Sequence, residues 1–340
     1  MKRASFQFEV LTPAIAGGAR PKQQAEIRPA SIRGQLRWWF RVLGGFQSQS
    51  GSVRSREAEV FGSISAGTLH SSPLVVRVAR PPACTPPKTM EGLGAAQFPD
   101  KGYLLWPLRR DEDARATISP DSKFELQVLW KGKAELWPDV LALVSIFANL
   151  GSLGFRGRRA MGALTANSVS PLAEALTRFA SPRNISIKWI PARSGDNAIK
   201  ELGGWLKSWR AYGRTKDDPR PEQQMPGFKW AKSDHDLGAA VLFGGPQAPA
   251  VFRAALGLPL NQRFNAGSLD WNTDSGRFAS PVLLRPHRTP AGEWRALVVF
   301  IHNHEWPVGT QVNAGRRKRV SVSLELLKAM QVDPRLTAFA

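Results

Sequence analysis

Three arginines, Arg33, Arg37 and Arg41, recur every fourth residue in the segment RPASIRGQLRWWFR, which spans positions 28–41. Residues four apart lie on one face of a helix, so the three guanidinium groups would form a ladder roughly 12 Å long. The segment has no acidic residue three or four positions away that could neutralise them. We therefore expect the ladder to be unpaired, and a row of unpaired cations is suited to binding a polyanion.

A helix must position this ladder. Ser31 is a favourable N-cap residue and Pro29 suits the turn before it, so we expect the helix to start there. Trp38 falls between the basic and apolar faces, where it could stack on a nucleic-acid base or pack in the core or a subunit interface. The apolar face, which we expect to lie against the core, consists of Ile32, Leu36, Trp39, Phe40 and Leu43.

A second group of arginines lies in the glycine-rich segment GSLGFRGRRAMGAL at positions 151–164. Glycines let a backbone approach a phosphate closely, and Arg156, Arg158 and Arg159 would supply the charge. The segment lacks the GK[ST] element of a Walker motif. The alternative interpretation is a flexible loop with solvated arginines. Beside the arginine ladder, contact with phosphate is the better hypothesis.

The whole chain is basic. It has 47 Lys and Arg against 27 Asp and Glu, a formal net charge of +20 and a pI near 11.0. A phosphate polymer or an anionic surface is the expected partner of such a chain. Arginine-rich codon usage in a soluble basic protein would give the same balance, since charge alone fixes neither fold nor specificity.

Residues suited to catalysis are few. The string HNH at 302–304 lacks the cysteines and acids of a nuclease site, and Asp234, His235 and Asp236 lack a further metal ligand at helical spacing. The single cysteine, Cys84, excludes an intramolecular disulfide and a multi-cysteine zinc site. We expect no catalytic residues, no metal and no cofactor.

The order of patterns predicts an α+β protein. With 340 residues, the chain suits two domains. Strands at 5–11, 74–78, 103–106, 124–130 and 163–169, with helices after Ser31 and at 136–150, give a β-α-β-β-α-β order. We therefore predict two tandem ferredoxin-like domains with loop insertions, at residues 1–175 and 176–340. In the second half we expect helices at 196–212, 249–256 and 320–330, a strand at 239–243, and a hairpin that turns at 290–292.

No apolar run is long enough to cross a membrane, and the start MKRASFQFEV lacks the apolar core of a signal peptide. We expect a cytoplasmic protein.

The segment from Thr12 to Arg41 resembles the signature of one family, the RAMP-type subunit that opens the Cmr series in type III-B CRISPR effector complexes. That signature combines a TP-x-x-x-GG turn, a step matched by Glu26, Ile27 and Arg28, and the motif S-I-[RK]-G-x-L-R-[FW]-W-[FW]-R. The family's glycine-rich loop is matched less well, because Ala160 stands in place of a glycine and Met161 in place of an aromatic residue. The segments at 277–281 and 283–286 also resemble the family's C-terminal half.

The resemblance implies a non-catalytic subunit at the end of a ribonucleoprotein filament, near the 3′ end of the guide RNA. Its partners would be the guide RNA (crRNA), the target RNA and other Cmr subunits. Sequence would be recognised by base pairing, and the protein would contact the backbone. We expect the RNA-binding residues to be Arg28, Arg33, Arg37, Trp38, Arg41, Arg156, Arg158 and Arg159.

Some of these arginines could instead be structural, with Arg28 or Arg33 bonded to Glu26 or to backbone carbonyls. Two other functions stay open. The protein could be an endoribonuclease that processes guide RNA, with His235 or His302 as general base. It could also be a protein-interaction cap whose basic faces bind an acidic neighbouring subunit.

Overall fold

The computed structural model describes residues 1–65, 68–95, 99–211, 224–245, 250–264, 267–274, 278–302, 311–315 and 318–339. The chain divides into two compact units. Unit 1 comprises 1–202, 284–303 and 338–340, and unit 2 comprises 203–283 and 304–337. The predicted boundary at residue 175 falls inside unit 1, because that unit is continuous from residue 1 to residue 202.

The first sheet of unit 1 has the strand order β4-β7-β1-β8, and every neighbouring pair is antiparallel. Phe6, Phe8 and Val10 of β1 are buried, as their alternation predicts. Phe8 lies opposite Phe124 of β7, with ring centroids 5.2 Å apart. The strands are β1 (Lys2–Val10), β4 (Leu74–Ala79), β7 (Lys123–Trp130) and β8 (Leu164–Ala166).

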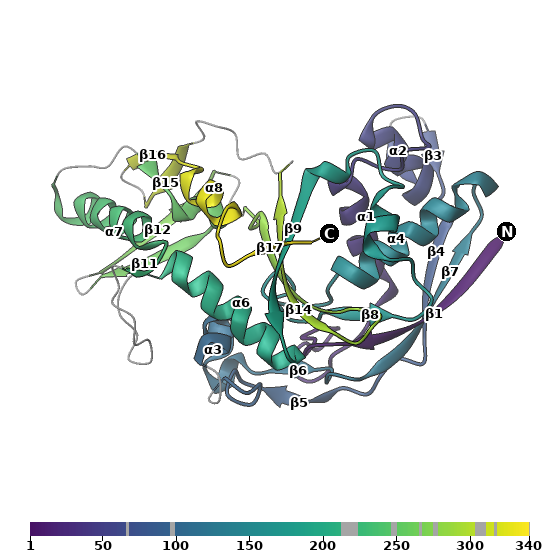
Figure 1. Ribbon diagram of the computed structural model, residues 1–340, viewed down its shortest axis with the longest axis horizontal. Helices are drawn as coiled ribbons and strands as arrows, with labels where there is room; N and C mark the ends of the chain where they lie inside the picture. Colours follow the sequence, from purple (N-terminus) through teal and green to yellow (C-terminus); the bar gives the residue numbers. More distant parts are fainter. Residues whose placement is uncertain are drawn as a thin grey trace. The chain divides into compact units, whose positions relative to one another are not determined.

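Two helices, α1 (Pro29–Val42) and α4 (Trp137–Leu150), pack side by side over this sheet (Figure 1). The helix α1 begins three residues earlier than predicted. Arg28 is its N-cap and Pro29 its first residue, so Ser31 is not the cap. Proline suits that position because its fixed φ is helical and the missing N–H would have had no partner. The helix α4 is buried on most of its surface, as its apolar sequence predicts.

Between the strands of this sheet lie the predicted insertions. The strand predicted at 103–106 is wrong, because the first three of its residues end the helix α3. The inserted elements are α2 (Val53–Phe61), β2 (Ser63–Ser65), β3 (Thr68–His70), β5 (Thr85–Lys88), α3 (Pro99–Leu105), β6 (Arg115–Thr117) and the 3-10 turns η1 (Trp106–Leu108) and η2 (Asp111–Asp113).

A second sheet has the order β13-β14-β9-β17. The chain passes in turn through β9 (Ile185–Ala192), α6 (Gly195–Arg210), β13 (Val282–Arg288), β14 (Trp294–Ile301), α8 (Glu325–Gln331) and β17 (Thr337–Ala338). This order of elements along the chain repeats that of β1, α1, β4, β7, α4 and β8. The order of strands within the second sheet likewise repeats that of the first. The hairpin β13–β14 turns between Thr289 and Glu293, as predicted. The short helix α5 (Leu172–Leu176) connects the two passes. Two 3-10 turns precede larger elements: η3 (Ala134–Leu136) leads into α4, and η4 (Pro182–Asn184) leads into β9.

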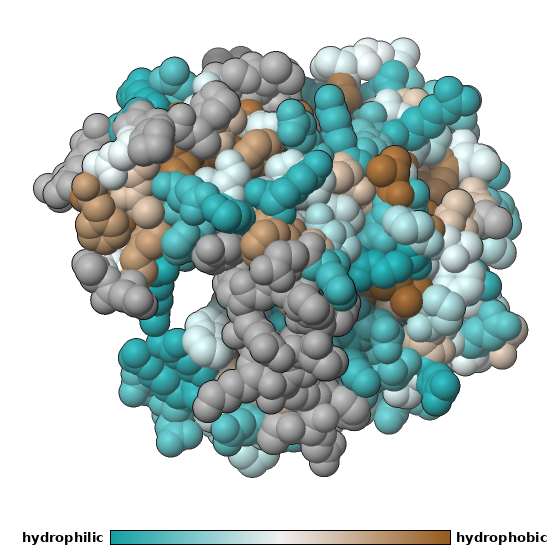
Figure 2. All heavy atoms as spheres, turned by 60° about the vertical axis from the view of Figure 1, so that its left-hand side comes forward, coloured by the Kyte–Doolittle hydropathy of each residue, from teal (hydrophilic) through white to brown (hydrophobic). Residues whose placement is uncertain are grey.

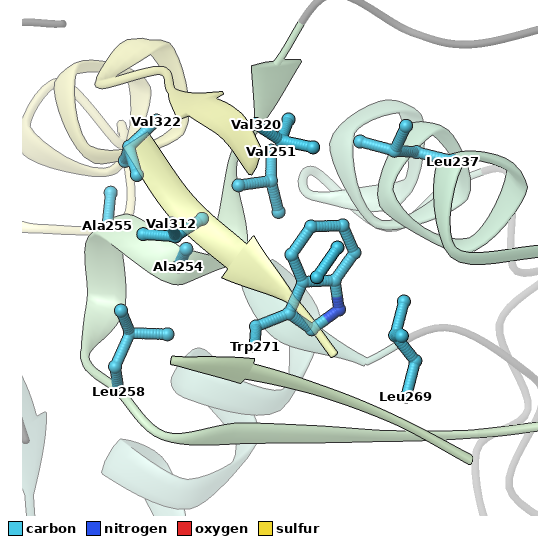
Figure 3. Close-up of a cluster of buried hydrophobic side chains, with 11 residues drawn as sticks. Leu237, Val251, Ala254, Ala255, Leu258, Leu269, Trp271, Val312, Val320 and Val322 are labelled. Atoms are coloured by element: carbon cyan, nitrogen blue, oxygen red, sulfur yellow. The ribbon is translucent and has the colours of Figure 1, made fainter. Parts of the chain in front are cut away.

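Unit 2 is built around a five-stranded sheet with the order β10-β16-β15-β12-β11. Trp271 is fully buried at its centre, among Val251, Val312 and Val320 (Figure 3). Its indole N–H donates to Oε1 of Gln262 at 3.0 Å, which satisfies the polar edge of the ring. The strands are β10 (Ala250–Val251), β11 (Leu260–Phe264), β12 (Gly267–Asn272), β15 (Gln311–Ala314) and β16 (Lys318–Val322).

Two predictions for this unit are wrong. Residues 239–243 end the helix α7 (Phe228–Phe243). In the segment predicted as a helix at 249–256, of which the structure describes 250–256, the chain forms β10 and then the short turn η6 (Arg253–Leu256). The helix predicted at 320–330 begins only at Glu325, because β16 takes its first residues. Trp205 and Trp209 of α6 are buried, and both donate to a carboxylate oxygen of Asp333.

The surface of the protein is mostly polar. On the face shown in Figure 2, hydrophilic side chains predominate and hydrophobic ones are scattered among them. In the described part of the chain, no helix has the length and apolar character needed to span a bilayer.

Candidate nucleic-acid interface

The arginine ladder lies on the outer side of α1. Ile32, Leu36, Trp39 and Phe40 are fully buried, so the apolar face predicted from the spacing packs into the core. On the other side, the Arg37 and Arg41 side chains are 44% and 54% exposed. Arg33 is half-buried, and it donates a hydrogen bond to the backbone carbonyl of Phe61. A structural role for Arg33, one of the alternatives, therefore coexists with its place in the ladder.

The ladder is not unpaired, which corrects the expectation from the sequence. Glu57 of α2 accepts hydrogen bonds from Nε of Arg37 and, at 2.5 and 2.7 Å, from Nε and Nη2 of Arg41. Its carboxylate is 7% exposed. Burial alone would raise the pKa of Glu57, but hydrogen bonds from Arg41 and Arg37 lower it below the ordinary value. One carboxylate cannot neutralise three guanidinium groups, so the face keeps a net positive charge.

Glu57→Gln tests the worth of these ion pairs. We expect it to lower the free energy of unfolding by about 2 kcal/mol at neutral pH, because two guanidinium groups lose their carboxylate. A carboxyl with a lowered pKa stabilises the fold above its unfolded pKa of about 4.3, and that contribution is lost as the pH falls through the folded pKa. The difference between wild type and variant in urea denaturation should therefore shrink in acid.

The matched control for this experiment is Glu112→Gln, which removes the exposed carboxylate paired with Arg110. That change should cost no more than about 0.5 kcal/mol at any pH. A constant stability difference for Glu57→Gln from neutral to acid pH would contradict the role of its ionised carboxylate.

The glycine-rich loop, residues 151–163, is held on two sides. The N–H of Phe155 donates to the carbonyl of Ile15 at 2.8 Å, and the N–H of Ala160 donates to the carbonyl of Leu284 in β13 at 2.9 Å. Thr12 adds a third anchor, because its hydroxyl donates to the carbonyl of Ala160 at 2.8 Å. The loop is therefore a fixed structure rather than a flexible connection.

Two of its glycines are required by close packing. At Gly154, with φ +86°, a Cβ would lie 2.4 Å from the carbonyl oxygen of Ile15. At Gly162, with φ +66°, it would lie 1.9 Å from the carbonyl oxygen of Leu153. Both positions thus need the left-handed backbone and the missing side chain that only glycine supplies.

The three arginines of this loop have different environments. Arg156 is half-buried and donates from Nε to the carbonyl of Leu104 at 2.6 Å. Arg159 is buried, and it donates to the carbonyl of Arg158 at 3.2 Å, which favours a structural role for it. Burial lowers the pKa of Arg158, whose guanidinium stays charged at neutral pH like that of other arginines.

Trp38 and Arg158 join the two arginine groups. The guanidinium carbon of Arg158 lies 4.7 Å from the centre of the Trp38 ring, within the range of a cation–π interaction. Trp38 is half-buried, and its neighbour Trp39 takes the fully buried place. Helix α1 and the loop therefore form one surface, although the sequence separates Trp38 from Arg158 by 120 positions. Arg28 lies exposed at the start of the same helix.

Phe155 is a member of this surface that the sequence prediction omitted. It is 47% exposed in the glycine-rich loop, and an exposed aromatic ring can serve as a platform for a base. Its place between Gly154 and Arg156 was a usable signal. Arg285 was also omitted. It is fully buried behind the loop and supports the backbone at both of the loop's ends.

The histidines do not form a catalytic group in the described part of the chain. His302 belongs to unit 1 and burial lowers its pKa, whereas His235 belongs to unit 2 beside Asp236. Asp234 is engaged by Arg253 and by two backbone N–H groups. The remaining residues of the HNH string lie outside the described residues. Within those residues, no cluster of three or more His, Cys, Asp or Glu is arranged to hold a metal.

The comparison with protein families finds one likeness. The RAMP superfamily matches residues 7–165, which contain β1, α1 and the glycine-rich loop. The chain is therefore similar to that superfamily over slightly less than half of its length.

Particular relatives come from the archaeon Pyrococcus furiosus. The chain is 31% identical over 174 residues to its CRISPR system Cmr subunit Cmr1-1, a match that covers 47% of this chain and 46% of that relative. It is 26% identical over 193 residues to Cmr subunit Cmr1-2, which covers 48% of this chain and 95% of that relative. The chain is thus homologous to the Cmr1 subunits, and it spans about half the length of the first of them.

A solved structure extends the likeness of the fold to the whole chain. The crystal structure of Cmr1 from Pyrococcus furiosus in its apo form matches with a TM-score of 0.55 and 16% sequence identity. The match covers 99% of this chain and 98% of that one. A mixed α+β fold of the Cmr1 type is therefore confirmed.

Proposed function

We propose that this protein is a non-catalytic, RNA-binding subunit of a cytoplasmic type III-B CRISPR (Cmr) effector complex. In this proposal it lies near the 3′ end of the guide RNA and holds the guide and the target RNA by their phosphates. Its other partners are the neighbouring Cmr subunits. The names of the two Pyrococcus furiosus relatives, both Cmr subunits, support the assignment to such a complex.

The observation that carries the RNA-binding role is the contact between Trp38 and Arg158. It makes the outer face of α1 and the glycine-rich loop a single basic surface, which we call the α1–loop surface. Its members are Arg28, Arg33, Arg37, Trp38, Arg41, Phe155, Arg156 and Arg158, with Arg159 supporting the backbone from below. A row of cations interrupted by aromatic rings is the typical surface for single-stranded RNA.

The repeated strand order supports the predicted architecture. We propose that the two passes, 1–175 and 176–340, are two ferredoxin-like folds and that α7, the five-stranded sheet and η6 form an insertion into the second. In such a fold the loops and helix faces beside the sheet are free to contact RNA while the sheet supplies the core.

Binding of labelled single-stranded RNA to the purified protein across a salt series tests the proposal. If about six phosphates are contacted, log affinity should fall with log salt at a slope of about −4. The double variant Arg37→Gln/Arg41→Gln and the single variant Arg158→Gln should each make the slope less negative, by about 0.7 for every phosphate that the variant no longer binds. The matched control is Arg319→Gln, which should bind RNA like wild type. Arg319 is also exposed and ion-paired, but it belongs to unit 2 and not to the α1–loop surface.

A wild-type slope near −1, or unchanged binding in the variants, would contradict the proposal. If RNA binding is absent but complex assembly needs the same arginines, the α1–loop surface is a protein interface. Gels of the bound RNA decide the third possibility, since cleavage that disappears in His302→Ala or His235→Ala would show a nuclease.

A further inference from the structure

Unit 1 contains a cavity of about 520 Å³. None of the described residues that line this cavity belongs to the α1–loop surface. One wall is the segment 165–173, which runs from the last two residues of β8 to the first two of α5. The opposite wall comes from the β13–β14 hairpin, and Phe339 lines it as well. Its volume is that of a pocket for one small ligand. None of the described residues that line it is acidic.

Arg295 of β14 is the polar group in this wall whose hydrogen bonding is incomplete. Its Nε–H is buried and has no acceptor among the described residues. Its guanidinium carbon lies 4.6 Å from the centre of the Trp189 ring and 5.7 Å from that of Phe339, and these rings hold it in place. Nη2 of Arg295 also lies 3.3 Å from Oε2 of Glu293, whose side chain is 65% exposed. The Arg295 side chain as a whole is 27% exposed, so its terminal N–H groups can donate to an anionic ligand oxygen in the cavity.

The remaining lining groups suit a ligand that is part anion and part flat ring. Arg288 adds a second guanidinium, which has five N–H donors. Its Nη2 donates to Oε1 of Glu9 at 2.7 Å. Burial, and then the charges of Arg285 and Arg295, lower the pKa of His287 to about 3, so its imidazole is neutral at neutral pH. Phe339 presents an apolar ring, and Asn167 and Ser168 present polar groups that can bond to a base edge.

We infer that this cavity binds one nucleotide of RNA, with its phosphate at Arg295 and its base against the apolar and amide groups. The choice of a nucleotide rests on the proposed RNA-binding function. A bare phosphate would leave the apolar wall uncovered, and an uncharged nucleoside would leave the guanidinium groups of Arg295 and Arg288 without an anion. The cavity thus takes up a single unpaired nucleotide, whereas the α1–loop surface follows the backbone.

Isothermal titration calorimetry of the full chain with adenosine 5′-monophosphate, adenosine and inorganic phosphate tests this inference. Wild type should bind the monophosphate about tenfold more tightly than either of the other two probes, because only the monophosphate satisfies both kinds of wall. Arg295→Gln should weaken that binding about tenfold.

A second variant does not depend on packing. Asn167 is exposed, so Asn167→Asp changes the charge at the cavity and leaves the fold undisturbed. It should weaken binding of the monophosphate about threefold through repulsion of like charges. The matched control is Arg110→Gln, because Arg110, like Arg295, pairs with a glutamate two residues away but does not line the cavity.

Absence of monophosphate binding by wild type, or wild-type binding in both variants, overturns the inference. Preference for inorganic phosphate over the monophosphate also overturns it. The RNA salt series separates this failure from that of the proposed function. If the steep salt dependence persists without monophosphate binding, only the cavity inference is wrong. If the monophosphate binds and RNA does not, the RNA-binding function is wrong and the cavity is a site for a free nucleotide.

Discussion

Replacing Arg285 with methionine is expected to lower the free energy of unfolding by about 3–5 kcal/mol. Arg285 is fully buried, and burial lowers its pKa to about 9, which leaves it charged at neutral pH. In place of a carboxylate it has backbone carbonyls as partners. It donates to those of Ala148, Gly151 and Leu164 at 2.7–2.9 Å. The first two end α4, where the helix dipole favours a cation.

The loss would be large because the methionine side chain fills the space but donates no hydrogen bond. Several buried carbonyls would then be without a donor at both ends of the glycine-rich loop. Urea denaturation followed by circular dichroism measures the change. Arg288→Met, in the same hairpin, removes a guanidinium that is 29% exposed, and it should cost about 1 kcal/mol or less. Equal losses in the two variants would contradict the role assigned to Arg285.

Gly162→Ala is expected to destabilise the protein by about 3 kcal/mol and to weaken RNA binding. A left-handed backbone alone costs about 1 kcal/mol for a residue with a side chain. The remainder arises because the new Cβ would lie 1.9 Å from the carbonyl oxygen of Leu153, which forces the backbone of the loop to move. RNA binding should weaken because Arg156 and Arg158 move with it.

The control for this variant is Gly292→Ala in the β13–β14 turn. Gly292 also has a positive φ, +88°, but a Cβ there would meet nothing within 4 Å. It should therefore show the conformational cost alone, because no backbone has to move to make room for the new side chain. If the two variants lose the same stability, the close approach of Gly162 to Leu153 is not what fixes the loop.

The sequence predicts those elements whose pattern is long and regular. The strand β1, the helices α1 and α4 and the β13–β14 hairpin all lie where periodicity placed them, within a few residues. Short apolar runs were the failures. Residues 239–243 have no period that separates a strand from a buried helix, and in the structure they are the last turn of α7.

The candidate site was predicted in its parts but not in its connections. The spacing of Arg33, Arg37 and Arg41 placed them on one helix face. Glu57, the partner of Arg37 and Arg41, lies on another helix, at least 16 positions away, and no local pattern indicates such a contact. The approach of Arg158 to Trp38 likewise depends on how the glycine-rich loop is anchored to Ile15 and Leu284. Such contacts follow from tertiary packing, which local spacing does not encode.

The buried position of Arg285 limits how the chain can be divided. This residue of the second pass completes the hydrogen bonding of a helix and a strand in the first, and Leu284 and Arg288 add bonds to Ala160 and Glu9. In a fragment that stops at residue 175, the buried carbonyls that accept from Arg285 would have lost this hydrogen-bond donor. The two passes resemble each other in order, but they are not two separable modules, and the first depends on the second for its cohesion.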